Sequence, residues 1–196
     1  MTNIKEILKE TNLFNLNESS FFDIHSDVVL TKQYIEKVID SLEYRYDGLE
    51  DEDTIERAKE EIIEEIEENF YNAEHKIYQL IKDHKIEIYR AIVVDSNWEK
   101  HLLTQGKHLG IYWAWDIKCA DAHWGYDSSK RTAILTAIID ERLVDWKTTM
   151  EQNSHLDYFG EREIRLVKNT PIKLKSITID DTEIDLIAYK DKKFFA

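Results

Sequence analysis

Two glutamates separated by a single residue stand out among the side chains that could do chemistry. Glu161 and Glu163 lie in the run YFGEREIRL, whose pattern predicts a β-strand, so both carboxylates are expected on one face of that strand. Carboxylates placed side by side repel each other, which raises the pKa of one and suits acid–base or charge-stabilising work. For this pair taken alone, an exposed acidic strand end is the simpler interpretation.

A second candidate is Arg90, in the middle of the apolar run IEIYRAIVV. Burial of a guanidinium costs free energy unless an anion compensates it, and its fork of donors suits a phosphate or a carboxylate. Taken alone, Arg90 is more simply an arginine at a sheet edge that reaches solvent or a structural glutamate.

An aromatic-rich segment over residues 109–126 provides the third candidate, with five aromatic side chains in 18 positions. Such density is typical of a core, and its excess over what a core needs indicates a planar ligand held by stacking. The five glycines are scattered, so no glycine-rich phosphate loop is present in the sequence.

The elements that must position these residues fall into two groups. Residues 1–85 have helical periodicity, with a short turn at 4–8, a helix over about 31–46, a break at Asp47-Gly48 and a long helix over about 53–84. From residue 86 the pattern predicts strands, joined by helical segments near 97–104 and 117–124. The expected strands cover residues 86–94, 133–139, 162–167, 172–179 and 183–190. The expected fold class is therefore α+β.

Composition limits the class of protein further. The 196 residues are 42% hydrophobic and 34% charged, which is typical of a helix-rich soluble protein with a real core. The single cysteine, Cys119, excludes an intrachain disulfide framework and favours a reducing compartment. The sequence contains no apolar run of membrane-spanning length and its N-terminus resembles no signal peptide, so a cytoplasmic protein without membrane contact is expected.

The net charge of −14 is concentrated in the first part of the chain. Residues 1–85 hold 22 Asp and Glu against 10 Lys and Arg, whereas residues 86–196 hold 18 against 16. An acidic surface repels phosphate backbones, so nucleic acid is not expected to bind the helical part. The Glu-rich run in the long helix is most simply a solvated face.

Taken in order, the three candidates resemble the ADP-ribosyltransferase superfamily. Arg90 matches the first arginine of its R-S-E signature, and Gly110-Ile111-Tyr112-Trp113-Ala114 is similar to the GIYFA segment of the poly-ADP-ribose polymerases. The run 161–166 resembles the E-x-E strand of bacterial toxins and arginine-specific enzymes. The resemblance covers about residues 86–180. The S-T-S segment of the R-S-E branch is absent, and residues 112–115 stand in its place.

Residues 1–85, which the resemblance does not cover, are expected to form an acidic helical region from their charge and periodicity. For residues 86–196 the resemblance implies a catalytic domain with a mixed β-sheet that binds NAD as co-substrate. It implies cleavage of the nicotinamide–ribose bond and transfer of ADP-ribose to a macromolecular acceptor, either protein or nucleic acid. Glu163 would be the catalytic carboxylate that faces the developing oxocarbenium-like centre. Glu161 would orient or deprotonate the acceptor.

The same resemblance implies the remaining site residues. Arg90 would hold the NAD pyrophosphate. Tyr112 and Trp124 would stack on the nicotinamide, with Trp113 as the reserve candidate for that role. Tyr158 and Phe159, just before the glutamate pair, would touch the target. No metal is expected. Small stand-alone members of the superfamily are mostly toxins or phage effectors, and that biological role is favoured here.

Two other functions stay open at this point. One is a non-catalytic interaction protein, whose acidic N-terminal helices bind a protein partner beside a transferase-like body. The other is an NAD glycohydrolase, in which water is the acceptor. The presence of Arg90, Glu161 and Glu163 together argues against a decayed site.

Overall fold

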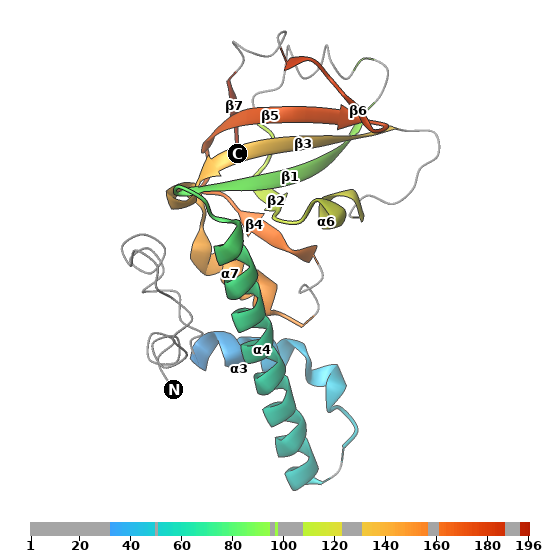
Figure 1. Cartoon of the computed structure of the whole chain (residues 1–196). Helices are drawn as coiled ribbons and strands as arrows, with labels where there is room; N and C mark the ends of the chain where they lie inside the picture. Colours follow the sequence, from blue (N-terminus) through green and yellow to red (C-terminus); the bar gives the residue numbers. More distant parts are fainter. Residues whose placement is uncertain are drawn as a thin grey trace.

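The computed structural model describes residues 32–49, 51–94, 97, 108–122, 131–156, 161–186 and 193–196. It combines helices with an antiparallel sheet, which confirms the expected α+β class (Figure 1). Helices come first along the described chain, and the strands begin at residue 85. The turn expected at 4–8 lies outside the described residues, as does the segment expected near 97–104 apart from residue 97.

The N-terminal part consists of α3 (Lys32–Ser41), the 3-10 turn η1 (Glu43–Arg45) and α4 (Glu52–Leu80). Gly48, with a φ of +86°, provides the break that the sequence predicts at this point. The helix expected over 31–46 is formed as two pieces, α3 and η1. The long helix expected over 53–84 is α4, which ends four residues earlier than expected. No described helix combines the length and apolar character that crossing a membrane requires.

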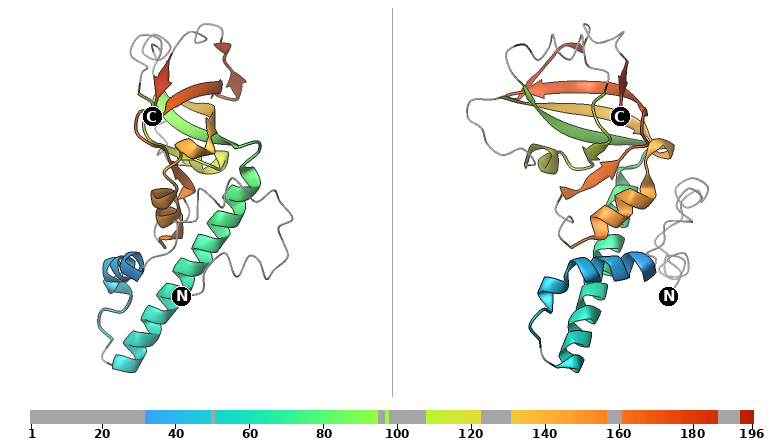
Figure 2. Two further views of the ribbon diagram at one scale, coloured as in Figure 1. Left: turned by 90° about the vertical axis from the view of Figure 1, so that its left-hand side faces the viewer. Right: turned by 180° about the vertical axis from the view of Figure 1, so that it is seen from behind.

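Both helices are amphipathic, and their apolar faces meet in a small cluster. Asp51 begins α4 as its N-cap, because its side chain accepts a hydrogen bond of 3.0 Å from the backbone N–H of Thr54. The cluster between α3 and α4 contains Ile35, Val38, Leu42, Ile62 and Ile66. This packing covers the N-terminal half of α4, which extends away from the sheet (Figure 2).

The sheet has the strand order β4-β2-β1-β3-β5-β6, and β7 pairs with β5. All named strand pairs are antiparallel, so the described strands do not form the mixed sheet that the resemblance implies. Its strands are β1 (Lys85–Val94), β2 (Tyr112–Ala114), β3 (Arg131–Asp140), β4 (Glu163–Arg165), β5 (Pro171–Ile179), β6 (Thr182–Glu183) and β7 (Phe194–Phe195). The strands expected over 86–94, 133–139 and 172–179 are confirmed. The strand expected over 183–190 is not formed at 184–186, while β2 and β7 are additional.

One main core joins the sheet to the C-terminal half of α4. Phe70, Ala73 and Ile77 of α4 are at most 1% exposed and belong to the same buried cluster as Ile88 of β1 and Leu135 of β3. The boundary expected near residue 86 therefore passes through this core instead of separating two independent units.

A further helix, α7 (Trp146–Ser154), has no counterpart among the expected elements. It contacts both α4 and β4, and Figure 2 shows it between α3 and the sheet. Its buried face is half polar, which explains why apolar periodicity does not reveal it. The buried residues of α7 are Trp146, Thr149, Met150, Asn153 and Ser154.

The half-buried Glu74 of α4 makes stability depend on pH. Burial raises the pKa of Glu74 from 4.5 to about 7. The folded chain then keeps a proton that the unfolded chain releases, so the free energy of unfolding falls as the pH rises between these two values. We expect Glu74→Gln to raise the free energy of unfolding by about 1–3 kcal/mol at pH 8 and hardly at all at pH 4. Urea unfolding at both pH values measures this, and an equal effect at both would contradict it.

Candidate active site

The three segments that resemble transferase motifs lie on neighbouring strands. β2 pairs with β1 on one side and with β4 on the other. Ala114 of β2 is in register with Tyr89 of β1 and with Glu163 of β4. Segments separated by more than 70 residues in sequence thus meet in one part of the sheet (Figure 1).

One face of these strands carries a carboxylate, an aromatic ring and a cation. Residues in register on antiparallel strands point to the same face, and residues two apart on a strand share a face. Glu163 and Ala114 therefore share their face with Tyr112 and Arg165, which are in register with each other. Tyr112 is 39% exposed, so its ring is accessible to a ligand on this face.

Tyr89 lies on the same face and has an electrostatically unusual hydroxyl. The pKa of Tyr89 is raised to about 12. Burial is the largest cause, and the hydrogen bond that the hydroxyl donates to the Glu87 carboxylate and the nearby charge of Asp116 add to it. Tyr89 is therefore a neutral hydrogen-bonding group at neutral pH.

Arg90 follows Tyr89 on β1 and so points to the opposite face from Glu163. Its Nη1 donates a hydrogen bond to the backbone carbonyl of Tyr112. Burial lowers the pKa of Arg90, and the charge of Glu163 opposes this shift to a smaller extent. This arrangement does not favour the expected role of Arg90 as a pyrophosphate ligand beside Glu163. Its contacts indicate that it fixes the segment leading into β2.

Gly110 is the residue against which the Arg90 guanidinium packs. Its φ is +85°, and a Cβ at this position would lie 3.0 Å from Cζ, Nη1 and Nη2 of Arg90. We expect Gly110→Ala to lower the free energy of unfolding by about 2–4 kcal/mol, because left-handed strain adds to displacement of the guanidinium. Gly48→Ala is the matched control, since Gly48 has a φ of +86° with nothing within 4 Å of the added Cβ. Chemical denaturation of both variants measures this. Equal losses of unfolding free energy in the two variants would show that the Arg90 contact contributes nothing.

Trp113, expected to contact nicotinamide, is a core residue. It is 2% exposed, and its Nε1 donates a hydrogen bond of 2.9 Å to the Gly110 carbonyl. It shares the opposite face with Ile164, with which it is in register. A ring enclosed in this way has no free face for a ligand, so its proposed stacking role is not supported by the fold.

Glu161 does not continue the strand that carries Glu163. β4 begins at Glu163, Glu161 is in a 3-10 turn, and Arg162 between them has a φ of +50°. The expected strand does not extend to Glu161, so strand alternation starts only at Glu163 and does not determine where the Glu161 carboxylate points.

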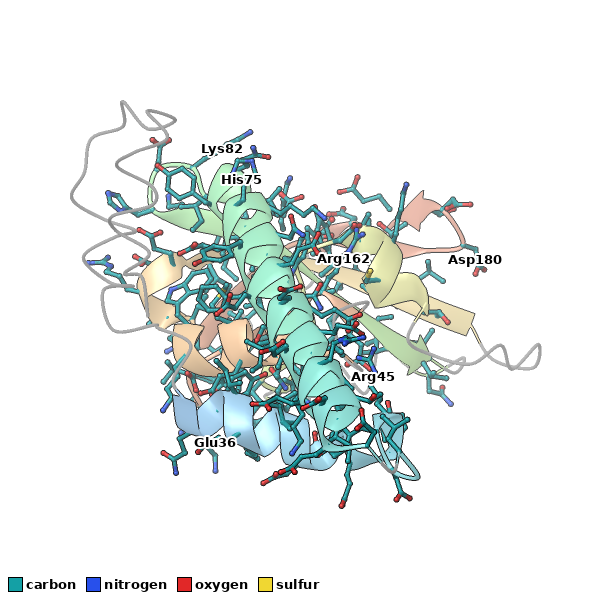
Figure 3. All side chains as sticks on the ribbon, turned by 90° about the horizontal axis from the view of Figure 1, so that it is seen from below. Glu36, Arg45, His75, Lys82, Arg162 and Asp180 are labelled. Carbon is teal, nitrogen blue, oxygen red and sulfur yellow. The ribbon has the colours of Figure 1, made fainter. Side chains whose placement is uncertain are left out.

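Arg162 itself links this turn to the segment that follows β2. It forms an ion pair with Asp116 and its guanidinium carbon lies 5.4 Å from the centre of the Trp115 ring. Figure 3 shows Arg162 beside α6 (Ile117–Ala122), the helix that follows Asp116. The ion pair and the ring contact fix the position of Arg162, the residue just before Glu163.

Three of the expected ligand and target residues, Trp124, Tyr158 and Phe159, lie outside the described residues. Sequence reasoning also missed two residues around Glu163. Arg165 could have been found by the same alternation that was applied to Glu161, since it lies two residues after Glu163. Asn153 of α7, whose side chain contacts the Glu163 backbone, carried no sequence signal.

Comparison of the chain with protein-family models gives no match, and neither do comparisons with curated proteins or with solved structures. The resemblance to the transferase superfamily therefore rests on the motif residues alone.

Proposed function

We propose that the protein is an ADP-ribosyltransferase that cleaves NAD at the nicotinamide–ribose bond and transfers ADP-ribose to a macromolecular acceptor. The observation that carries the proposal is the pairing of β4 with β2, which puts Glu163 and Tyr112 on one face of the sheet, while Arg90 on the neighbouring strand β1 holds the 110–112 segment from the other face. Direct pairing of two strands is one way in which residues distant in sequence come to share a face, as a single site needs.

The residues on the Glu163 face fit NAD by type. The Tyr112 ring can stack on a planar nicotinamide, Arg165 supplies positive charge, and Glu163 supplies a carboxylate. Arg165 forms an ion pair with Asp145, so a ligand phosphate would compete with that carboxylate. Arg90 contributes indirectly, by fixing the segment from Gly110 to Tyr112.

In the proposed reaction, Glu163 stabilises the positive charge that develops on the ribose as nicotinamide departs. The bond that breaks joins the ribose anomeric carbon to the nicotinamide nitrogen, and the bond that forms joins the same carbon to the acceptor. Glu161, in the turn before β4, would receive the acceptor proton as general base. The acidic helices α3 and α4 would then influence which macromolecule approaches, as the net charge of residues 1–85 suggests.

The test is to incubate the full chain with NAD labelled separately in the nicotinamide and in the adenylate, with and without protein and RNA fractions of a cell lysate. Release of nicotinamide with the adenylate label on a macromolecule supports the proposal. Release with free ADP-ribose in every reaction indicates a glycohydrolase. Absence of nicotinamide release in all reactions overturns the enzymatic proposal and favours an interaction protein.

A further inference from the structure

β4 is a three-residue strand at the edge of the sheet. Its outer edge is hydrogen-bonded by residues of α7 and by Asp145, the residue before α7. The backbone N–H of Asp145 donates to the Arg165 carbonyl at 2.8 Å, and the Arg165 N–H donates to Thr149 Oγ1 at 3.0 Å. Asn153 Nδ2 donates to the Glu163 carbonyl at 2.6 Å. These bonds satisfy backbone groups that an edge strand otherwise leaves to water.

Asn153 uses its whole amide at this position. Nδ2 donates a second hydrogen bond to the Thr149 carbonyl at 2.7 Å, and Oδ1 accepts one of 3.1 Å from Trp115 Nε1. The residue is 1% exposed, so water does not compete for these bonds. Two donors aimed at carbonyls and one acceptor aimed at an indole N–H are the pattern of an amide, which a carboxylate cannot reproduce.

This arrangement ties Glu163 to three parts of the fold. Its backbone is paired with Ala114 of β2 on one side and bonded to Asn153 on the other. Trp115, which Asn153 also holds, donates its backbone N–H to the Arg162 carbonyl at 2.9 Å. A displacement of the Asn153 side chain would therefore move the residue before Glu163 as well as Glu163 itself.

We propose that Asn153 is a positioning residue that holds the Glu163 carboxylate at the reacting centre through the β4 backbone. The role of Asn153 in catalysis rests on the proposed NAD cleavage. Its role in holding the β4 backbone in place does not. A carboxylate that stabilises a transition state must be held closely, because a displacement of about 1 Å can cost about 100-fold in rate.

The test compares Asn153→Asp with Ser154→Ala in the full chain. Asn153→Asp keeps the size and the acceptor for Trp115 and removes both donors. Ser154 is the matched control: it is equally buried on the same helix, but its hydroxyl bonds to Tyr34 of α3 and to the Glu151 carbonyl and not to β4. The readouts are nicotinamide release from NAD and amide hydrogen exchange of a peptide containing β4.

We expect Asn153→Asp to lower kcat by about 10- to 100-fold with KM changed less than about threefold, and to speed exchange in β4 about tenfold or more. Ser154→Ala should keep kcat within about twofold and leave β4 exchange unchanged. If the aspartate variant does not fold, Thr149→Val removes the acceptor of the Arg165 N–H at nearly constant volume and should speed β4 exchange in the same way.

The outcomes separate this inference from the proposed function. An active wild-type protein with equal kcat and equal β4 exchange in the Asn153 and Ser154 variants overturns the positioning role and leaves NAD cleavage standing. A wild-type protein that releases no nicotinamide overturns NAD cleavage and with it the catalytic part of the inference. Exchange alone then decides whether Asn153 holds β4, and unchanged exchange in both Asn153→Asp and Thr149→Val rejects that as well.

Discussion

Glu163→Gln should lower the rate of nicotinamide release from NAD by about 100- to 1,000-fold while leaving the melting temperature within a few degrees of the wild-type value. The amide keeps the shape of the side chain and removes the negative charge that opposes the developing ribose cation, and removal of one such group typically has an effect of this size. The side chain is only half-buried, and the bonds from Asn153 and β2 engage the Glu163 backbone, so the glutamine variant keeps the bonds that fix β4 and loses the attraction between the Glu163 charge and Arg90.

Glu161→Gln is the matched control, because it removes the same charge two residues away in the turn before β4. Since Glu161 is assigned to the acceptor, its variant should keep slow release of nicotinamide to water and lose transfer to the macromolecule. Nicotinamide release and label transfer are measured side by side for both variants. Equal loss of both activities in the two variants would show that the roles are not divided, and full activity of Glu163→Gln would remove Glu163 from the chemistry.

The elements with strong periodicity could be predicted from the sequence. The apolar stripe of α4, the break at Gly48 before this helix and the long strands β1, β3 and β5 follow from local pattern and turn chemistry. The local pattern also predicts on which face Arg90 lies. Arg90 is two residues after Ile88 and four after Ile86 on β1, so strand alternation places Arg90 on the same face as these core residues.

The rest depended on contacts between distant segments. Which residues share a face with Glu163 is decided by the register of β2 with β1 and β4, and three-residue strands are too short to show their pairing in sequence. α7 was missed because Thr149, Asn153 and Ser154 are polar residues on its buried face. Their hydrogen bonds make them core residues, and a scan for apolar periodicity does not detect that kind of core.

Removal of residues 1–85 should leave a chain that is insoluble or lacks cooperative unfolding. The deletion removes Phe70, Ala73 and Ile77, which are at most 1% exposed and pack in the main core with the sheet. Loss of a buried Phe side chain alone costs about 3–5 kcal/mol and loss of a buried Ile about 2–5 kcal/mol, which together approach the whole stability of an ordinary domain. The deletion also exposes the apolar face of the sheet that α4 covers, and exposed faces of this kind aggregate.

Removal of residues 1–50 provides the contrast. This shorter deletion keeps Asp51 as the N-cap and the whole of α4. Among the residues that the structure describes, it exposes the cluster that Ile62 and Ile66 form with α3 and removes the contact of Tyr34 with Ser154. It should stay soluble and unfold cooperatively at a lower temperature than the full chain, because the main core is intact. Solubility after expression and thermal unfolding followed by circular dichroism distinguish the two deletions. A soluble 86–196 fragment with a cooperative transition would show that the sheet forms its core without α4, and would restore residue 86 as a true domain boundary.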